Sequence, residues 1–301
     1  MQGLLRHIYK YVKGYFQLMV LESLFNPFAV KRYPWEMFIA GVVYSLISLF
    51  LAYISFREHA SLLMVFFIVM SAIPLIYNAI KNEEEIDLKI HSEWKLLREH
   101  AKVLLFLLYF FFGVVVSLAA AYVLLPSGIV EQLFSVQTSA IVDVQNNVQG
   151  NLTQFGLFGG IFLNNLKVLL FCLIFSFLFG VGAIFILTWN ASVVAVAVGN
   201  LFKTQIASLA TEFGSVGIMQ YFGIGTVSFF RYMFHGVIEI AAYFVAGIAG
   251  SIISIAVIKH NLEEESVLYD ALDLVLISLI LLLFAGVVEV YVTPLIFSIA
   301  H

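Results

Sequence analysis

The chain alternates between long apolar runs and short polar connections. Most of the runs are long enough for a helix to cross a bilayer, which takes roughly 20 residues. Strands of a membrane barrel are shorter and alternate between apolar and polar residues, so the runs predict an all-α, polytopic transmembrane helical bundle. We expect six spans, at about residues 36–55, 60–80, 103–125, 164–188, 228–258 and 274–300. Pro294 is expected to kink the last of them.

Residues 190–228 are harder to assign because their apolar runs are short. The runs 191–202 and 216–230 cover twelve and fifteen residues, and Gly223 interrupts the second. Such lengths fit half-helices that enter and leave the membrane on one side better than full spans. We therefore predict a re-entrant region here, and a seventh crossing by residues 191–202 is the alternative.

An amphipathic segment precedes the first span. Apolar residues recur every three or four positions from Leu5 to Met19, and Arg6 and Lys10 fall on the opposite side. This pattern predicts an interfacial helix on the membrane surface, with a cytosolic helix as the alternative. We divide the chain into residues 1–102, with this helix, a transmembrane hairpin and a cytoplasmic helix, and residues 103–301, the membrane core.

Lysine and arginine predict the orientation. Five precede the first span and five lie between the second and third spans, whereas residues 129–163 contain none. Because basic connections stay inside, we expect a multi-pass protein of the cell membrane with a cytoplasmic N-terminus. Residues 129–163 are then an extracytoplasmic segment.

The composition is that of a membrane protein, and the net charge argues against a nucleic-acid partner. Hydrophobic residues make up 62% of the chain and charged residues 11%, against about 25% charged in soluble domains. The net charge of −4 is too small to suggest a nucleic-acid partner. A single cysteine, Cys172, cannot form a disulfide within the chain. We expect membrane lipid and other membrane proteins as partners, and self-association stays open.

Ionisable residues gather in the fifth predicted span, and another lies at a matching depth in the sixth. Arg231, His235 and Glu239 are spaced four apart, so they share one line on a helix. Glu239 lies about 28 Å before the last connection and Glu289 about 24 Å after it, so their depths match. With six spans, the end of the fourth span reaches the same face. The predicted polar intramembrane cluster comprises Asn190, Arg231, His235, Glu239 and Glu289.

The face of the fifth predicted span that carries Arg231, His235 and Glu239 continues, after Glu239, with small residues. Such residues let a second helix approach closely in lipid, so this stripe is expected to pack against a neighbouring helix. It comprises Ala242, Ala246, Gly250 and Ser254.

Three interpretations of the cluster stay open. In the first it is structural, because charges inside a membrane normally pair and so hold helices together. In the second it lines a path for an ion, a proton or a lipid headgroup. In the third, His235, Glu239 and Glu289 bind a divalent metal in an intramembrane enzyme, although the sequence has neither a His-Glu-x-x-His pair nor a cysteine ligand nearby.

Other catalytic patterns give no support for an enzyme. The sequence has neither a Gly-x-Ser-x-Gly elbow nor a phosphate-binding loop. We therefore expect no catalytic residue, no metal and no cofactor.

Three pieces of the chain carry a family resemblance. They are His235-Gly236-Val237-Ile238-Glu239 with the following Ala246–Gly250 run, Asn164-Asn165, and Glu289 with Thr293-Pro294. Together they resemble the stage II sporulation protein M family over about residues 103–300. Phe234 stands where that family usually has proline, and the first hundred residues look like an N-terminal extension.

The resemblance implies an integral membrane protein. In spore formers, the family works with partner membrane proteins and a peptidoglycan-degrading enzyme during engulfment. We expect a non-enzymatic membrane component that organises partner proteins or remodels the envelope or the membrane. The alternative is a transporter, channel or lipid-moving protein that uses the cluster as its pathway.

Overall fold

The structure is a bundle of long helices. The computed structural model describes residues 35–87, 93–149, 153–179, 182–258 and 265–298, and the regular structure in this part is helical throughout. Seven of the described helices are long and apolar enough to cross a membrane, which confirms the all-α membrane class but gives seven spans instead of six. The interfacial helix expected near the N-terminus lies outside the described residues.

The first two spans form the predicted antiparallel hairpin. α4 (Trp35–Ser55) and α5 (Ala60–Asp87) are joined by the short 3-10 turn η1 (Arg57–His59). α6 (Glu93–Leu124) follows and runs without a break through residue 102, where we had divided the chain.

α4 and α6 touch backbone to backbone at a reciprocal pair of glycines. A Cβ atom on Gly41 would collide with the carbonyl oxygen of Phe110, and one on Gly113 would collide with that of Phe38. Only glycine fits at both positions, because any side chain would push the helices apart.

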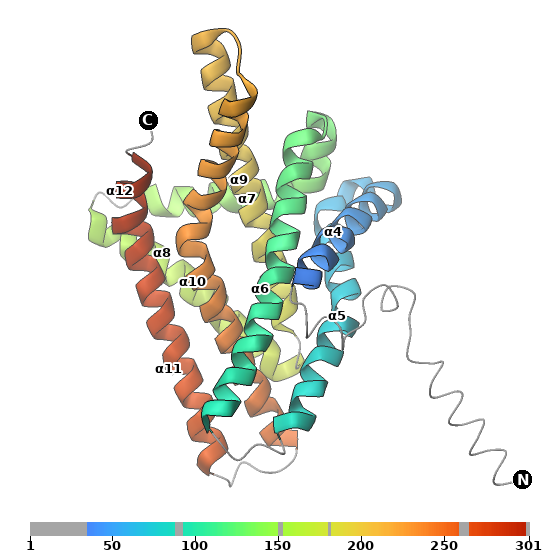
Figure 1. Cartoon of the computed structure of the whole chain (residues 1–301), viewed down its shortest axis with the longest axis vertical. Helices are drawn as coiled ribbons and strands as arrows, with labels where there is room; N and C mark the ends of the chain where they lie inside the picture. The colour runs from blue at the N-terminus through green and yellow to red at the C-terminus, as the bar shows by residue number, and fades with distance from the viewer. Residues whose placement is uncertain (1–34, 88–92, 150–152, 180–181, 259–264, 299–301) are drawn as a thin grey trace, which may run out of the picture.

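α7 (Ser127–Gln149) runs across the long axis of the bundle instead of along it (Figure 1). Its Gln137 is fully buried and bonds to Ser61 of α5 and Ser192 of α9. The polar helix is thereby fastened to two spans. The expected extracytoplasmic segment is shorter than predicted, because residues 154–163 belong to the next candidate span.

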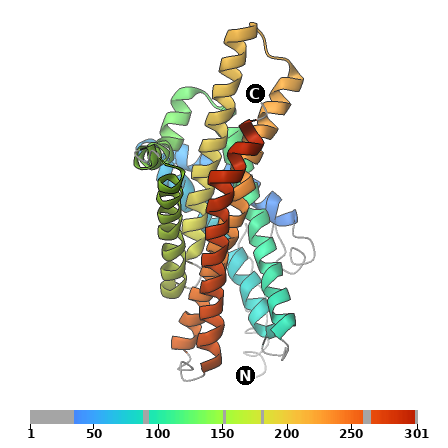
Figure 2. The ribbon, with the colours of Figure 1, turned by 90° about the vertical axis from the view of Figure 1, so that its left-hand side faces the viewer.

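The predicted re-entrant region is wrong. α9 (Ala183–Phe213) and α10 (Ile218–Ile258) are two continuous helices that meet at a tight connection with Gly214 in the left-handed conformation, φ 75°. Their hairpin extends beyond the other helices at one end of the molecule (Figures 1 and 2). The two short apolar runs are parts of these two long, continuous helices.

The fourth span is also shifted from its predicted place. α8 covers Gln154–Phe179, and α9 begins at Ala183 directly after Gly182. A Cβ atom on Gly182 would collide with the carbonyl oxygen of Phe175, so the sharp reversal between the two helices needs glycine there. Asn165 therefore lies in the middle of the fourth span, and Asn190 belongs to the fifth.

The last span contains a local distortion next to its proline. α11 (Glu265–Val287) continues into a π-helical turn, η2 (Val288–Val292), and then into α12 (Thr293–Ser298). Pro294 has no backbone N–H, so it interrupts the regular hydrogen-bond ladder, and the widened turn accommodates the loss. The distortion expected at Pro294 thus lies in the turn just before it.

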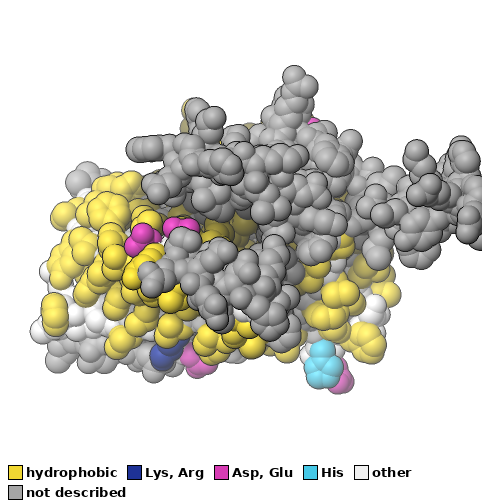
Figure 3. All heavy atoms as spheres, turned by 90° about the horizontal axis from the view of Figure 1, so that it is seen from below, with side chains coloured by type: hydrophobic (Ala, Val, Ile, Leu, Met, Phe, Trp, Pro, Cys, Tyr) yellow, Lys and Arg dark blue, Asp and Glu magenta, His cyan; other side chains and the backbone are white. Residues whose placement is uncertain are grey.

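Hydrophobic side chains dominate the described surface seen in Figure 3, as expected for helices that face lipid. If each of the seven helices crosses once, the two ends of the described chain lie on opposite sides of the membrane. The α9–α10 hairpin, α7 and α12 then share one side.

Candidate functional site

A polar cluster lies where α8, α10 and α11 meet. α10 contributes His235 and Glu239, which are one helical turn apart. Glu289 comes from the π-helical turn and Thr293 from the residue that follows it. α8 contributes Asn165. We call these five residues the polar cluster.

Glu239 links all three helices through its carboxyl group. The Asn165 amide nitrogen donates a hydrogen bond to Glu239 Oε1. The carboxyl group of Glu289 lies beside that of Glu239. Carboxyl groups from α10 and from the π-helical turn after α11 thus meet at this point.

His235 connects the carboxyl pair to Thr293. Its Nδ1 lies 3.3 Å from Thr293 Oγ1, and its Nε2 lies 3.8 Å from Glu289 Oε1. Thr293 Oγ1 also lies 3.0 Å from the Val288 carbonyl oxygen, to which it can donate. The contact of Nδ1 with Thr293 leaves the other ring nitrogen, Nε2, facing Glu289.

The polar cluster is partly exposed at Glu289 and closely packed on the side of Tyr243 and Gly250. The Glu289 side chain is 28% exposed and that of His235 11%, and Arg231, one turn further along α10, is exposed. In the other direction Tyr243 is buried, and Gly250 sits against the Leu173 carbonyl oxygen of α8. Close helix packing thus closes the cluster below Glu239.

The structure brings together three of the five residues that were expected to cluster. His235, Glu239 and Glu289 meet as counting along the helices suggested. Asn190 does not join them, because it lies in α9 and makes no side-chain hydrogen bond to them within the described ranges. Arg231 is exposed and forms no ion pair with either carboxyl group there.

The small-residue stripe faces the neighbouring helices. Ala242 and Ala246 are fully buried, Gly250 is buried against α8, and Ser254 is half-buried. Gly247, next to the stripe, packs on Ala183 of α9. These close contacts fix the position of α10 along α8 and α9, and so the position of Glu239 relative to both helices.

Sequence reasoning missed Asn165 and Thr293 as members of the cluster. Both stand in the pieces that carry the family resemblance, Asn164-Asn165 and Thr293-Pro294, which was the available signal. Asn165 was overlooked because the fourth span was placed too late, so that this residue seemed to lie at the span's end.

Metal binding finds no geometric support in the part of the chain that the structure describes. It contains no group of three His, Cys, Asp or Glu side chains that could hold a metal ion. His235, Glu239 and Glu289 are close to one another. The hydrogen bonds of His235 and Glu239 go to Thr293 and Asn165, which are not metal ligands here.

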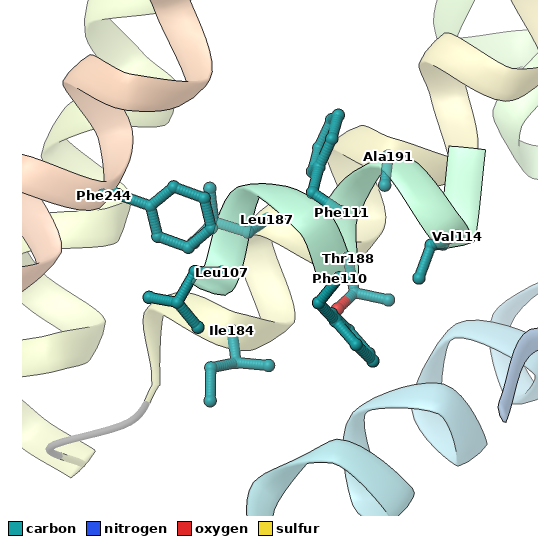
Figure 4. Close-up of a pocket in the computed structure, with 9 residues that line it drawn as sticks. All are labelled: Leu107, Phe110, Phe111, Val114, Ile184, Leu187, Thr188, Ala191 and Phe244. Carbon is teal, nitrogen blue, oxygen red and sulfur yellow. The ribbon is translucent and has the colours of Figure 1, made fainter. Parts of the chain in front are cut away.

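An internal cavity lies away from the cluster, between α6, α9 and α10 (Figure 4). Its volume is about 20 Å³, and its walls are apolar except for Thr188. A void of this size holds about one water molecule, and water needs polar partners. It is a packing gap and not a ligand site.

A model of the stage II sporulation protein M family matches residues 62–294, which is most of the chain and includes the whole polar cluster. The chain belongs to this family. The family region begins at residue 62 instead of near residue 103, so α5 lies within it and α4 precedes it.

One relative is an uncharacterised protein of Methanocaldococcus jannaschii. It is 31% identical over 144 residues, which cover 46% of this chain and 71% of the relative. No solved structure matches the chain. Membership in the stage II sporulation protein M family thus assigns a membrane protein, and the role must be argued from the geometry.

Proposed function

We propose that this chain is a non-enzymatic membrane component that organises other membrane proteins, and that the α9–α10 hairpin contacts them. The helices of the hairpin have 31 and 41 residues, which correspond to about 46 and 61 Å. The hydrocarbon layer is only about 30 Å thick. The hairpin is therefore long enough to project well beyond it.

The observation that carries the proposal is the apolar surface of this projecting part. α9 presents exposed polar residues there, including Thr204, Ser208 and Glu212, as expected in water. The facing end of α10 instead exposes Ile218 (78%) and Met219 (85%). Apolar side chains grouped outside the lipid mark a surface for contact with another protein.

A groove between the two helices extends this surface. It has a volume of about 470 Å³ and is open on one side. Five aromatic side chains line it: Phe202, Tyr221, Phe222, Phe229 and Phe230. Aromatic residues dominate the energetics of protein contacts, so the groove suits an apolar side chain of a partner.

The polar cluster has a supporting role in this proposal. It ties α10 to α8 and α11 near the base of the hairpin, through Asn165, Glu239 and Glu289. Hydrogen bonds between membrane helices contribute about 1–2 kcal/mol each. The cluster therefore holds the projecting part of α10 in a fixed direction.

Photo-cross-linking tests the proposal. We would place a cross-linking amino acid at Met219 or Phe222, and at Thr204 as the control on the polar side of the hairpin. We expect the first two positions to capture one membrane protein, identified by mass spectrometry. Met219→Ser with Ile218→Ser should lower that yield roughly tenfold. Equal capture at Thr204, or adducts with lipid alone, would contradict the proposal.

A transporter, channel or lipid-moving protein is the second candidate, and one observation favours it. Glu289 keeps 28% of its side chain exposed, so one carboxyl group of the cluster is not enclosed by the protein. This role requires flux through liposomes that contain the purified chain, measured with a pH-sensitive or cation-sensitive dye. A flux that Glu239→Gln removes would favour it, and no flux above that of empty liposomes would exclude protons and the cations tested.

A further inference from the structure

The fourth span is the least enclosed of the seven. Only 17% of its most apolar 18-residue stretch is buried in the structure, against 33% to 61% for the corresponding stretches of the other six. Large apolar side chains form a continuous outward stripe along α8 at spacings of three and four residues. The exposed members are Leu163, Leu170, Phe171, Ile174 and Leu178.

A lysine lies in the middle of this stripe. Lys167 is thirteen residues from Gln154 and eleven from Leu178, the ends of the span, or about 20 and 17 Å along the helix. Its side chain is exposed and has no ion pair or hydrogen bond to any residue within the described ranges.

A charge at this depth is costly when it faces lipid. Lysines near the end of a span avoid the cost by extending their stem to the interface. From the middle of α8 the stem covers only part of the distance to either end. Intramembrane charges normally pair with a group of opposite sign, and within the described chain Lys167 has none.

A glycine on the same line leaves room for a second helix. Gly159, Leu163 and Lys167 are spaced four apart, so they lie on one face of α8. A Cβ atom on Gly159 would meet nothing within 4 Å, so the space in front of it is open. Small residues on an open face allow close approach of another helix in lipid.

We propose that this face of α8 docks a transmembrane helix of a different protein, and that the helix carries an aspartate or glutamate opposite Lys167. The inference rests on the proposed function, because it names the surface and the chemistry of a partner that the chain organises. Charge complementarity supplies the argument: the face is apolar at both ends and carries one cation at its centre.

A second copy of the chain fits this face less well. Among the described residues, the exposed acids lie outside the spans or within two turns of a span's end, as Glu212 and Asp270 do. Glu289 lies deeper, but it already contacts His235 and Glu239. A second copy would therefore bring no free acid to the depth of Lys167.

The test uses the full chain in the membranes of its source cells. A photo-cross-linking residue replaces Leu163, Phe171 or Ile174, with Ile280 and Leu283 on the exposed face of α11 as controls. We expect the α8 positions to capture a membrane protein whose cross-linked peptide lies in a transmembrane segment with an Asp or Glu. Lys167→Leu should lower the yield roughly tenfold, and Lys167→Arg should keep it.

A charge exchange completes the test. Lys167→Glu should lose the cross-link, and replacing the partner's acid by lysine should restore it. Thermal unfolding of each Lys167 variant shows that the chain still folds, which we expect because the side chain is exposed. Adducts with lipid only, with a second copy, or with a segment that lacks an acid would overturn the inference, as would an unchanged yield in Lys167→Leu.

The cross-linking results at the two surfaces distinguish the docking face on α8 from the proposed function. If Met219 or Phe222 captures a protein but the α8 positions do not, the proposed function stands and the docking face on α8 is wrong. If neither surface captures a protein, both are wrong.

Discussion

The side-chain amide of Asn165 in α8 donates a hydrogen bond to the carboxyl group of Glu239 in α10. The two residues are 74 positions apart in the chain, so this bond joins two spans that are distant in sequence. It also supplies a neutral partner to a carboxyl group inside the membrane. The stability of the α8–α10 contact should therefore depend on it.

Asn165→Ala should lower the stability of the purified protein by about 1–3 kcal/mol, because the buried side of Glu239 loses its donor. Asn190→Ala is the matched control, since Asn190 makes no side-chain hydrogen bond within the described residues. Thermal unfolding in detergent measures both. Equal shifts for the two variants would show that the bond does not hold α8 to α10.

Gly250→Ala should separate α10 from α8. The added methyl group would collide with the Leu173 carbonyl oxygen, which belongs to the backbone and cannot turn away. Gly223→Ala is the control in the same helix, where a Cβ atom meets nothing within 4 Å. We expect a loss of about 1–3 kcal/mol for the first, and a small gain, up to about 1 kcal/mol, for the second. A neutral Gly250→Ala would disprove the close contact.

Gln137→Leu should loosen α7 from the bundle. The leucine keeps the volume but leaves Ser61 and Ser192 without their shared partner, at a cost of about 1–3 kcal/mol. Gln132→Leu on the exposed side of the same helix serves as the control and should change little. Protease cleavage within residues 127–149 should become faster in the first variant and stay unchanged in the second.

Cysteine labelling should place the hairpin and the start of α11 on opposite sides of the membrane. In a chain without Cys172, Ser215→Cys and Ser127→Cys should react with a membrane-impermeant reagent from one side, and Tyr269→Cys from the other. The basic residues predict that the first two react from outside. Labelling of Ser215→Cys and Tyr269→Cys from the same side would remove one of the seven crossings.

The membrane class and the meeting of His235, Glu239 and Glu289 could be predicted from the sequence for a simple reason. A helix rises by a fixed amount per residue, so counting from the last connection places Glu239 and Glu289 at similar depths. The four-residue spacing of His235 and Glu239 then puts both on one face. These arguments need only regular helices, and α10 and most of α11 are regular.

The errors arose where a local pattern has two physical meanings. Gly223 was interpreted as a break, but the helix passes through it because nothing in the surroundings demands a turn there. The true turn at Gly182 lies inside an apolar run, where hydropathy carries no signal. That single error moved Asn165 out of the predicted cluster and Asn190 into it.

The reciprocal glycines of α4 and α6 join the helix that precedes the family region to the helices within it. α4 precedes the family region, which starts at residue 62, yet Gly113 within that region has no space for a side chain because Phe38 lies against it. A chain shortened to begin at residue 62 would leave a groove on α6 with bare backbone facing lipid. α4 is thus an integral part of the bundle, although it precedes the region that the family model matches.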